Sequence, residues 1–138
     1  MDQPPPRPRI EPDLLALIAL GGALGAALRY TVDAWAPSAG VDGFPWTTFG
    51  INVLGAFGLS ALHVYVPTHP RLPRRVRGVL GAGLLGGFTT FSAYAEEARA
   101  LLAGGHEALA LTYLLGTLVA TVLAVEAARR VPSLWSRR

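Results

Sequence analysis

The chain has 138 residues, of which 51% are apolar and only 15% are charged. A small soluble domain carries about a quarter charged residues, so this balance indicates a membrane protein instead. The absence of cysteine excludes a disulfide framework and a thiolate metal site. The net charge of +3 comes entirely from arginines, which lie between apolar runs and at the ends. That pattern is typical of membrane topology, and we expect no nucleic-acid partner.

Four apolar segments follow a polar, proline-rich opening, and each has roughly the 20 residues that a helix needs to cross a bilayer. A soluble four-helix bundle would need polar outer faces, which these segments lack. We therefore predict an all-α integral membrane protein with four transmembrane helices in one domain, residues 14–131. The domain is flanked by a disordered N-terminal tail, 1–13, and a basic C-terminal tail, 132–138. The expected helices cover about 14–35, 47–66, 76–103 and 108–131.

The third segment contains the sequence GLLGGFTTFSAY, residues 83–94. Its paired glycines and its Thr-Thr step are poor helix formers, so we expect the third helix to break near its middle. Irregular backbone is tolerated at membrane depth where it is buried in protein or lines a water-filled cavity. The break is therefore a candidate site.

Polar side chains recur inside the apolar segments, where each needs a partner or a water-filled path. Those of the second and fourth segments form one helical stripe each, and the third segment adds a group around the break. These residues are Thr48, Asn52 and Gly55; Tyr113, Thr117 and Thr121; and Thr89, Thr90, Ser92 and Glu97. Helix packing explains a single hydroxyl group, but two aligned stripes beside a broken helix favour a polar conduit.

The acids and histidines lie near span ends or in loops, and no nucleophile motif accompanies the histidines. We therefore expect no enzyme. Two alternatives to a channel stay open at this point. A small four-helix multidrug or cation exporter should carry a glutamate in its first span, which this sequence lacks. A non-transporting membrane scaffold would explain the glycines but not Asn52 and the hydroxyl stripes.

Ten of the twelve arginines fall on the side of the two termini and the second connection. The opposite side has at most Arg99, and Arg29 lies within the first span. By the positive-inside rule, we predict that both termini are cytoplasmic.

Each segment also carries a recognisable signature. These are GGALGAALRY (21–30), WTTFGINVLGAFGLSAL (46–62), GAGLLGGFTTFSAYAEE (81–97) and the Tyr-x3-Thr-x3-Thr pattern that starts at Tyr113. Together they resemble the fluoride channel family of bacteria, known as Fluc or CrcB proteins, over roughly residues 14–130. The resemblance implies a fluoride-selective channel that exports cytoplasmic fluoride passively across the bacterial plasma membrane.

The same resemblance implies an antiparallel dual-topology dimer with two fluoride pores and a structural sodium ion (Na+) at its centre. The sodium ligands would be the main-chain carbonyls of Gly86 and Thr89, which the helix break frees. Hard oxygen ligands suit a small cation. The arginine asymmetry argues for one fixed orientation, so we favour an oppositely oriented paralogue as the dimer partner over a second copy of this chain.

The resemblance also implies a set of pore residues: Asn52, Phe91, Tyr94, Thr48, Tyr113, Thr117, Thr121 and Ser92. Ring edges at Phe91 and Tyr94 would stabilise the anion. Tyr94 departs from the family's phenylalanine, and its hydroxyl would either donate to fluoride or narrow the path. Asn52 would supply amide donors beside the path. Arg29 would attract anions to a vestibule or form a structural ion pair, and Glu97 would pack or gate near the pore end.

Overall fold

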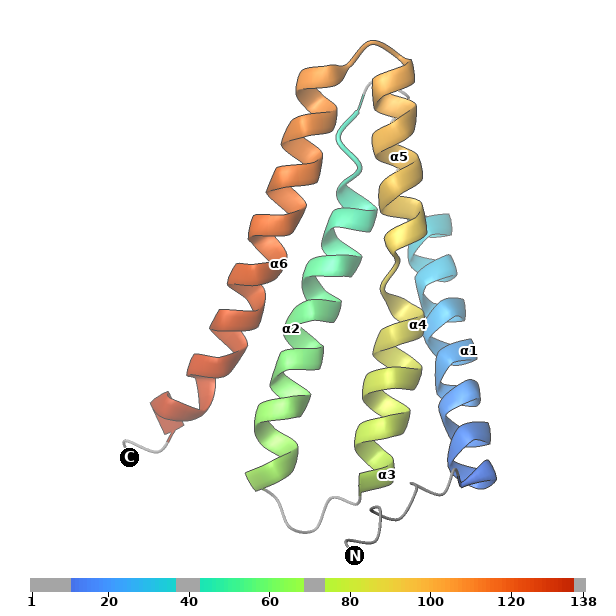
Figure 1. Cartoon of the computed structure of the whole chain (residues 1–138), viewed down its shortest axis with the longest axis vertical. Helices are drawn as coiled ribbons and strands as arrows, with labels where there is room; N and C mark the ends of the chain where they lie inside the picture. Colours follow the sequence, from blue (N-terminus) through green and yellow to red (C-terminus); the bar gives the residue numbers. More distant parts are fainter. Residues whose placement is uncertain (1–10, 37–42, 69–73, 136–138) are drawn as a thin grey trace, which may run out of the picture.

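The computed structural model describes residues 11–36, 43–68 and 74–135, and most of these residues are helical (Figure 1). The predicted all-α class is therefore confirmed. Three helices are long, and a divided helix lies between the second and the last of them. Their bounds are α1, Pro12–Trp35; α2, Trp46–Thr68; α3, Arg74–Arg77; η1, Gly78–Leu85; α4, Gly86–Phe88; α5, Phe91–Ala103; and α6, Glu107–Trp135. We call α3, η1, α4 and α5 together the third helix.

The helix ends differ slightly from the expected ones. Helix α1 begins at Pro12, because proline has a φ suited to the first turn and lacks only an amide that would have no partner there. Helix α6 continues to Trp135, into the segment expected to be a tail. Residues 1–10 and 136–138 of the expected tails lie outside the described residues.

The predicted break of the third helix is confirmed. Thr89 has φ −74° and ψ 158°, and Thr90 has φ −148° and ψ 127°, so both are extended between the helical α4 and α5. The segment before the break is also irregular, because η1 is a stretch of π-helix. Such stretches are rare and frequently occur at functional sites.

Three helices are long and apolar enough to cross a bilayer: Pro12–Trp35, Trp46–Tyr65 and Glu107–Val131. The third helix is divided into pieces, of which the longest has 13 residues. That piece alone is shorter than the roughly 20 residues that a spanning helix needs.

Helix α2 packs mainly on α6, whereas α1 packs on η1 and α4 (Figure 1). Glycines bring α1 and the third helix together. A Cβ atom on Gly25 would collide with the carbonyl oxygen of Leu84, and one on Gly87 would collide with that of Gly22. Small residues of this kind let membrane helices approach backbone to backbone.

The chain buries little of its own apolar surface. A small core of Ala98, Leu101, Ala110 and Tyr113 joins α5 to α6. Elsewhere large apolar side chains stay exposed, such as Leu24 at 66%. A water-soluble monomer rarely exposes so much contiguous apolar surface, so lipid or another protein must cover it.

Candidate functional site

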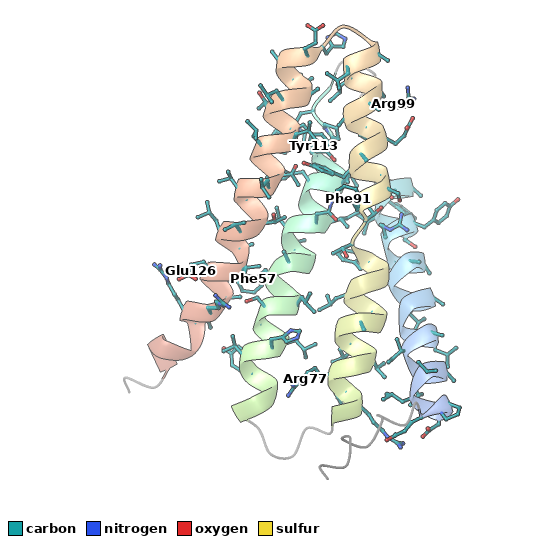
Figure 2. The ribbon with its side chains drawn as sticks, in the orientation of Figure 1. Phe57, Arg77, Phe91, Arg99, Tyr113 and Glu126 are labelled. Atoms are coloured by element: carbon teal, nitrogen blue, oxygen red, sulfur yellow. The ribbon has the colours of Figure 1, made fainter. Side chains whose placement is uncertain are left out.

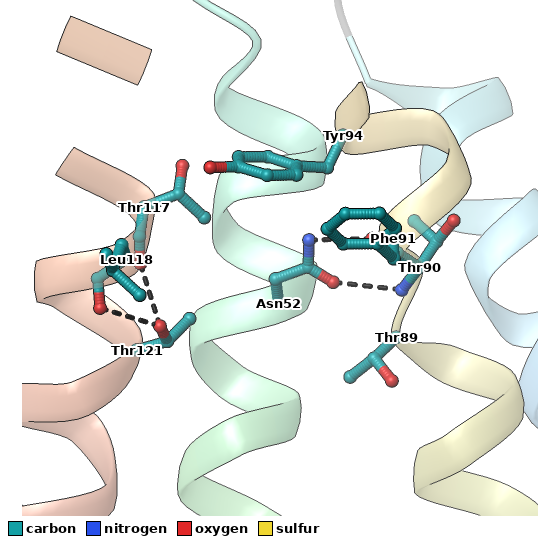
Figure 3. Close-up of a pocket in the computed structure, with 8 residues that line it drawn as sticks. All are labelled: Asn52, Thr89, Thr90, Phe91, Tyr94, Thr117, Leu118 and Thr121. Atoms are coloured by element: carbon teal, nitrogen blue, oxygen red, sulfur yellow. Dashed lines mark hydrogen bonds between the residues drawn. The ribbon is translucent and has the colours of Figure 1, made fainter. Parts of the chain in front are cut away.

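The helix break is held by a side chain from another helix. Asn52 of α2 accepts a hydrogen bond from the backbone N–H of Thr90 at 2.9 Å, and its Nδ2 donates to the Thr90 carbonyl at 2.9 Å (Figure 3). The amide thus replaces the helical acceptor that the broken helix withholds from the Thr90 N–H, and it adds a donor to the Thr90 carbonyl, which as the N-cap carbonyl also accepts the first bond of α5. Thr90 also caps α5, because its Oγ1 accepts from the N–H of Ala93 at 3.2 Å.

These bonds leave two carbonyl groups without their helical donors. In a continuous α-helix, the N–H of Thr90 would donate to Gly86 and that of Ala93 would donate to Thr89. Here those N–H groups are taken by Asn52 and by the Thr90 side chain. The freed carbonyls are the two that the family resemblance assigns to sodium. Their chemistry fits a hard cation such as Na+.

A cavity of about 390 Å³ lies beside the break (Figure 3). Its lining comes from α2, from α6 and from the third helix around the break. The lining residues are Asn52, Thr89, Thr90, Phe91, Tyr94, Thr117, Leu118 and Thr121. We call this space the Asn52 cavity. It brings together five of the eight predicted pore residues, from three different helices.

One hydroxyl group in this cavity is unpaired. Thr117 is buried, and its Oγ1 has no hydrogen-bond partner among the described residues. The hydroxyl of Thr121, by contrast, lies 2.9 Å from the carbonyl oxygens of Thr117 and Leu118. A buried hydroxyl without a partner costs free energy, and no described residue uses the Thr117 donor.

The remaining predicted pore residues lie outside the lining of the Asn52 cavity. Thr48 donates to one carboxylate oxygen of Glu97 at 2.7 Å, and Tyr113 donates to the other at 2.6 Å. Figure 2 shows Tyr113 projecting from α6 toward α5. This cluster links α2, α5 and α6, and it adjoins the cavity because the rings of Tyr113 and Tyr94 are 5.1 Å apart. Ser92 lies at the break, with its Oγ 3.2 Å from the Oγ1 of Thr90.

The two aromatic residues of the break differ in their surroundings. Phe91 is 79% exposed, and its ring centroid lies 5.9 Å from that of Tyr94. The Tyr94 hydroxyl donates to the carbonyl of Leu114 in α6 at 2.9 Å. This hydroxyl therefore ties α5 to α6 in the present structure. The amide nitrogen of Asn52 points toward both rings (Figure 3).

Arg29 is half-buried on α1, and its Nε is buried without a hydrogen-bond partner. No ion pair joins it to another described residue. Of the two roles considered for Arg29, the structural ion pair is therefore not seen in the described part of the chain.

Sequence reasoning missed two features of this site. The sequence pattern marks Thr90 only as a polar residue near the break, although it is both the partner of Asn52 and the cap of α5. A Thr followed by a helix is a recognisable cap signal. Leu118 lines the cavity as well, and no local pattern distinguishes it from the other leucines of α6.

Comparison with known proteins gives consistent results. The family described as "CrcB-like protein, Camphor Resistance (CrcB)" matches residues 16–129. Fluoride-specific ion channel FluC 1 of Streptomyces coelicolor is 44% identical over 127 residues, which cover 89% of this chain and 82% of that protein. Fluoride-specific ion channel FluC 2 of Nocardia farcinica is 44% identical over 125 residues, which cover 91% of this chain and 89% of that protein. A fluoride-specific ion channel FluC of Thermus thermophilus is 46% identical over 102 residues, which cover 74% of this chain and 80% of that protein.

Proposed function

Because the chain belongs to the CrcB-like protein family, we propose that it is a fluoride channel of the bacterial plasma membrane. It lets cytoplasmic fluoride leave the cell passively and so reduces fluoride toxicity. The observation that carries the proposal is the Asn52 cavity, where a broken helix, an amide, a free hydroxyl and two aromatic rings meet. The relatives' names supply the identity of the ion.

The donors of the cavity suit a small, strongly hydrated anion. Nδ2 of Asn52 has two hydrogens, of which the Thr90 carbonyl takes one. The second hydrogen and the unpaired Thr117 hydroxyl can replace water around fluoride. The positive ring edges of Phe91 and Tyr94 add weak attraction without a fixed charge that would trap the ion.

The cluster of Thr48, Glu97 and Tyr113 lies next to the Asn52 cavity, through which we propose that fluoride passes. Its hydroxyl protons are already donated to the carboxylate, so it positions α2, α5 and α6 rather than offering free donors. Arg29 lies on α1, which does not line the Asn52 cavity, and its guanidinium charge would draw anions toward a vestibule.

The functional unit we propose is an antiparallel dimer. In this dimer, the pieces of the divided third helix together form the fourth membrane span of each subunit. Support comes from the exposed apolar surface, including Phe91, that a single chain leaves uncovered. The Gly86 and Thr89 carbonyls would hold Na+ at the dimer centre. The ion would supply positive charge that satisfies carbonyl groups freed from both subunits.

The dimer partner we propose is an oppositely oriented paralogue, with both termini of this chain in the cytoplasm. The start of α1, the start of α3 and the end of α6 lie at one end of the molecule (Figure 1). Of the seven arginines among the described residues, five lie in α3 or in the last turns of α6: Arg74, Arg75, Arg77, Arg129 and Arg130. Reporter fusions at both termini test the orientation, and equal populations of the two orientations would instead support a homodimer.

The decisive experiment is fluoride efflux from proteoliposomes, measured with a fluoride electrode and repeated with chloride. The protein is prepared alone and together with a co-expressed paralogue. Fluoride-selective efflux in either preparation supports the channel, and efflux from the chain alone excludes an obligate heterodimer. If folded protein is silent in both preparations, the channel proposal is wrong.

A further inference from the structure

A second cavity, of about 570 Å³, lies between the α3 end of the third helix and α2. Its walls include His63 of α2, Arg77 of α3, and Gly81 and Ala82 of η1. Figure 2 shows the Arg77 side chain in the region between α3 and α2. We call this space the Arg77 cavity. Its small residues leave room for a hydrated ion.

Arg77 has no partner within the described part of the chain. Its Nε is buried and makes no hydrogen bond, and no described carboxylate pairs with its guanidinium. Arg75, two residues earlier, instead pairs with Glu11 at 2.9 Å and with Asp13 at 3.0 Å. A partly buried charge with no counter-ion among the described residues is costly, so the Arg77 cavity favours an anion.

The other polar group of this cavity does not neutralise Arg77. His63 has its Nδ1 2.8 Å from the carbonyl oxygen of Leu59. A carbonyl only accepts, so Nδ1 carries the hydrogen. The ring is then neutral or positive, never negative. No Asp or Glu of the described part of the chain lines the Arg77 cavity, so Arg77 gives its lining a positive charge.

The two cavities follow each other along the third helix. Gly86 lines the Arg77 cavity, and Thr89 and Thr90 line the Asn52 cavity. Arg77 lies at the arginine-rich end of the molecule, which is the cytoplasmic end in the orientation proposed above. In that orientation the Arg77 cavity is the nearer of the two cavities to the cytoplasm.

Resting on the proposed function, we infer that the Arg77 cavity is an anion-capture site that concentrates cytoplasmic fluoride at the entrance of the path. A positive charge at the mouth of a low-dielectric cleft raises the local concentration of anions and their rate of entry. The width of the cavity lets the ion keep much of its water. Binding is then weak enough for the ion to move on.

The test is fluoride efflux from proteoliposomes over a range of internal fluoride concentrations. We expect Arg77→Gln to slow efflux roughly tenfold at low fluoride, within the range that electrostatic steering provides, and to approach the wild-type rate at saturating fluoride. Arg77→Lys should restore most of the rate because it keeps the charge. Arg75→Gln removes a charge from the same end outside the cavity, and it should match the wild type.

A second pair of variants leaves Arg77 in place, so that the test stands even if Arg77→Gln fails to fold. Ala82→Glu puts a carboxylate into the cavity and should slow efflux at low fluoride, whereas Ala82→Gln, of similar size, should not. The inference is overturned if Arg77→Gln behaves as Arg75→Gln does at every concentration. It is also overturned if lysine and glutamine at position 77 impair efflux equally. A silent wild-type protein would overturn the proposed function itself.

Discussion

At the scale of single residues, Asn52 links the helix break to the cavity. Its amide is bonded to both backbone groups of Thr90, yet it keeps one N–H for the cavity. Without Asn52, the Thr90 N–H would be a partly buried donor with no partner, which costs about 1–3 kcal/mol. One side chain therefore stabilises the break and contributes a donor beside it.

We expect Asn52→Asp to weaken both the helix break and fluoride transport. The carboxylate can still accept from the Thr90 N–H, but it cannot donate to the Thr90 carbonyl, and its charge repels fluoride. Efflux should fall roughly tenfold or more, the effect of at least about 1.4 kcal/mol on a barrier. Proteoliposome efflux and the Tm in detergent measure the two effects.

Ser60→Ala is the control for that experiment. Ser60 of α2 also bonds to a neighbouring helix, donating to the Val125 carbonyl at 3.0 Å, but it does not line the Asn52 cavity. Its loss should lower the Tm slightly and leave efflux unchanged. If Asn52→Asp and Ser60→Ala behaved alike in efflux, the assigned role of Asn52 would be wrong.

Thr117→Val should separate stability from transport. The valine has nearly the same shape but lacks the hydroxyl, which is buried without a partner in the described structure. Its removal should keep or raise the Tm, since an unpaired buried hydroxyl costs about 1–3 kcal/mol. Fluoride efflux should nevertheless fall several-fold.

Thr112→Val provides the comparison on the same helix. The Thr112 hydroxyl is exposed and bonds within α6 to the Ala108 carbonyl at 2.8 Å, outside the cavity. This variant should transport as the wild type does. A lower Tm for Thr117→Val with normal efflux would show that the Thr117 hydroxyl serves packing alone.

At the scale of elements, the third helix is positioned by its contact with α1. This contact depends on glycine because the backbones approach too closely for a Cβ atom at Gly25 or Gly87. The same close packing keeps α4 fixed just before the break, so that the extended Thr89 and Thr90 follow at a defined place. The position of the Asn52 cavity therefore depends on α1, although α1 does not line the cavity.

Gly87→Ala should disturb this contact, because its methyl group would overlap the backbone of Gly22. Such overpacking typically costs about 1–3 kcal/mol, and here the obstacle is backbone that cannot rotate away. We expect a lower Tm, less folded protein and reduced efflux. Gly50→Ala is the matched control, since nothing lies within 4 Å of its added Cβ, and it should fold normally. Equal stability of the two variants would contradict this account of the packing.

At the scale of the whole molecule, one chain leaves much apolar surface uncovered. Phe91 is mostly exposed beside the cavity, and the cluster of buried side chains, Ala98, Leu101, Ala110 and Tyr113, lies where α5 meets α6. The proposed dimer would cover this surface and bring two sets of freed carbonyls together. The sodium proposal therefore makes a prediction for the assembled protein.

Purified protein should have a higher Tm in sodium chloride than in choline chloride of equal ionic strength. A ligand that binds only the folded state at 100 times its Kd stabilises by about 2.7 kcal/mol, so the shift should be readily measured. Lower sodium should also reduce the dimer fraction in size-exclusion chromatography. Identical Tm values in the two salts would argue against a structural sodium ion.

The amino-acid sequence by itself determined the class of the protein and the place of its break. Long apolar runs, glycine pairs and the Thr-Thr step act locally, so composition and spacing are enough to read them. The stripes of Thr48 and Asn52 and of Thr117 and Thr121 follow from helical periodicity, which fixes the face on which a side chain lies.

Only the tertiary structure decided which atoms meet across the helices. Asn52 bonds to Thr90, 38 residues away, and Glu97 takes the protons of Thr48 and Tyr113. Periodicity gives a residue's face, but not the height and rotation at which a neighbouring helix packs against it. The unpaired hydroxyl of Thr117 is likewise a result of packing. It could not be read from the sequence, because having no partner depends on every residue around it.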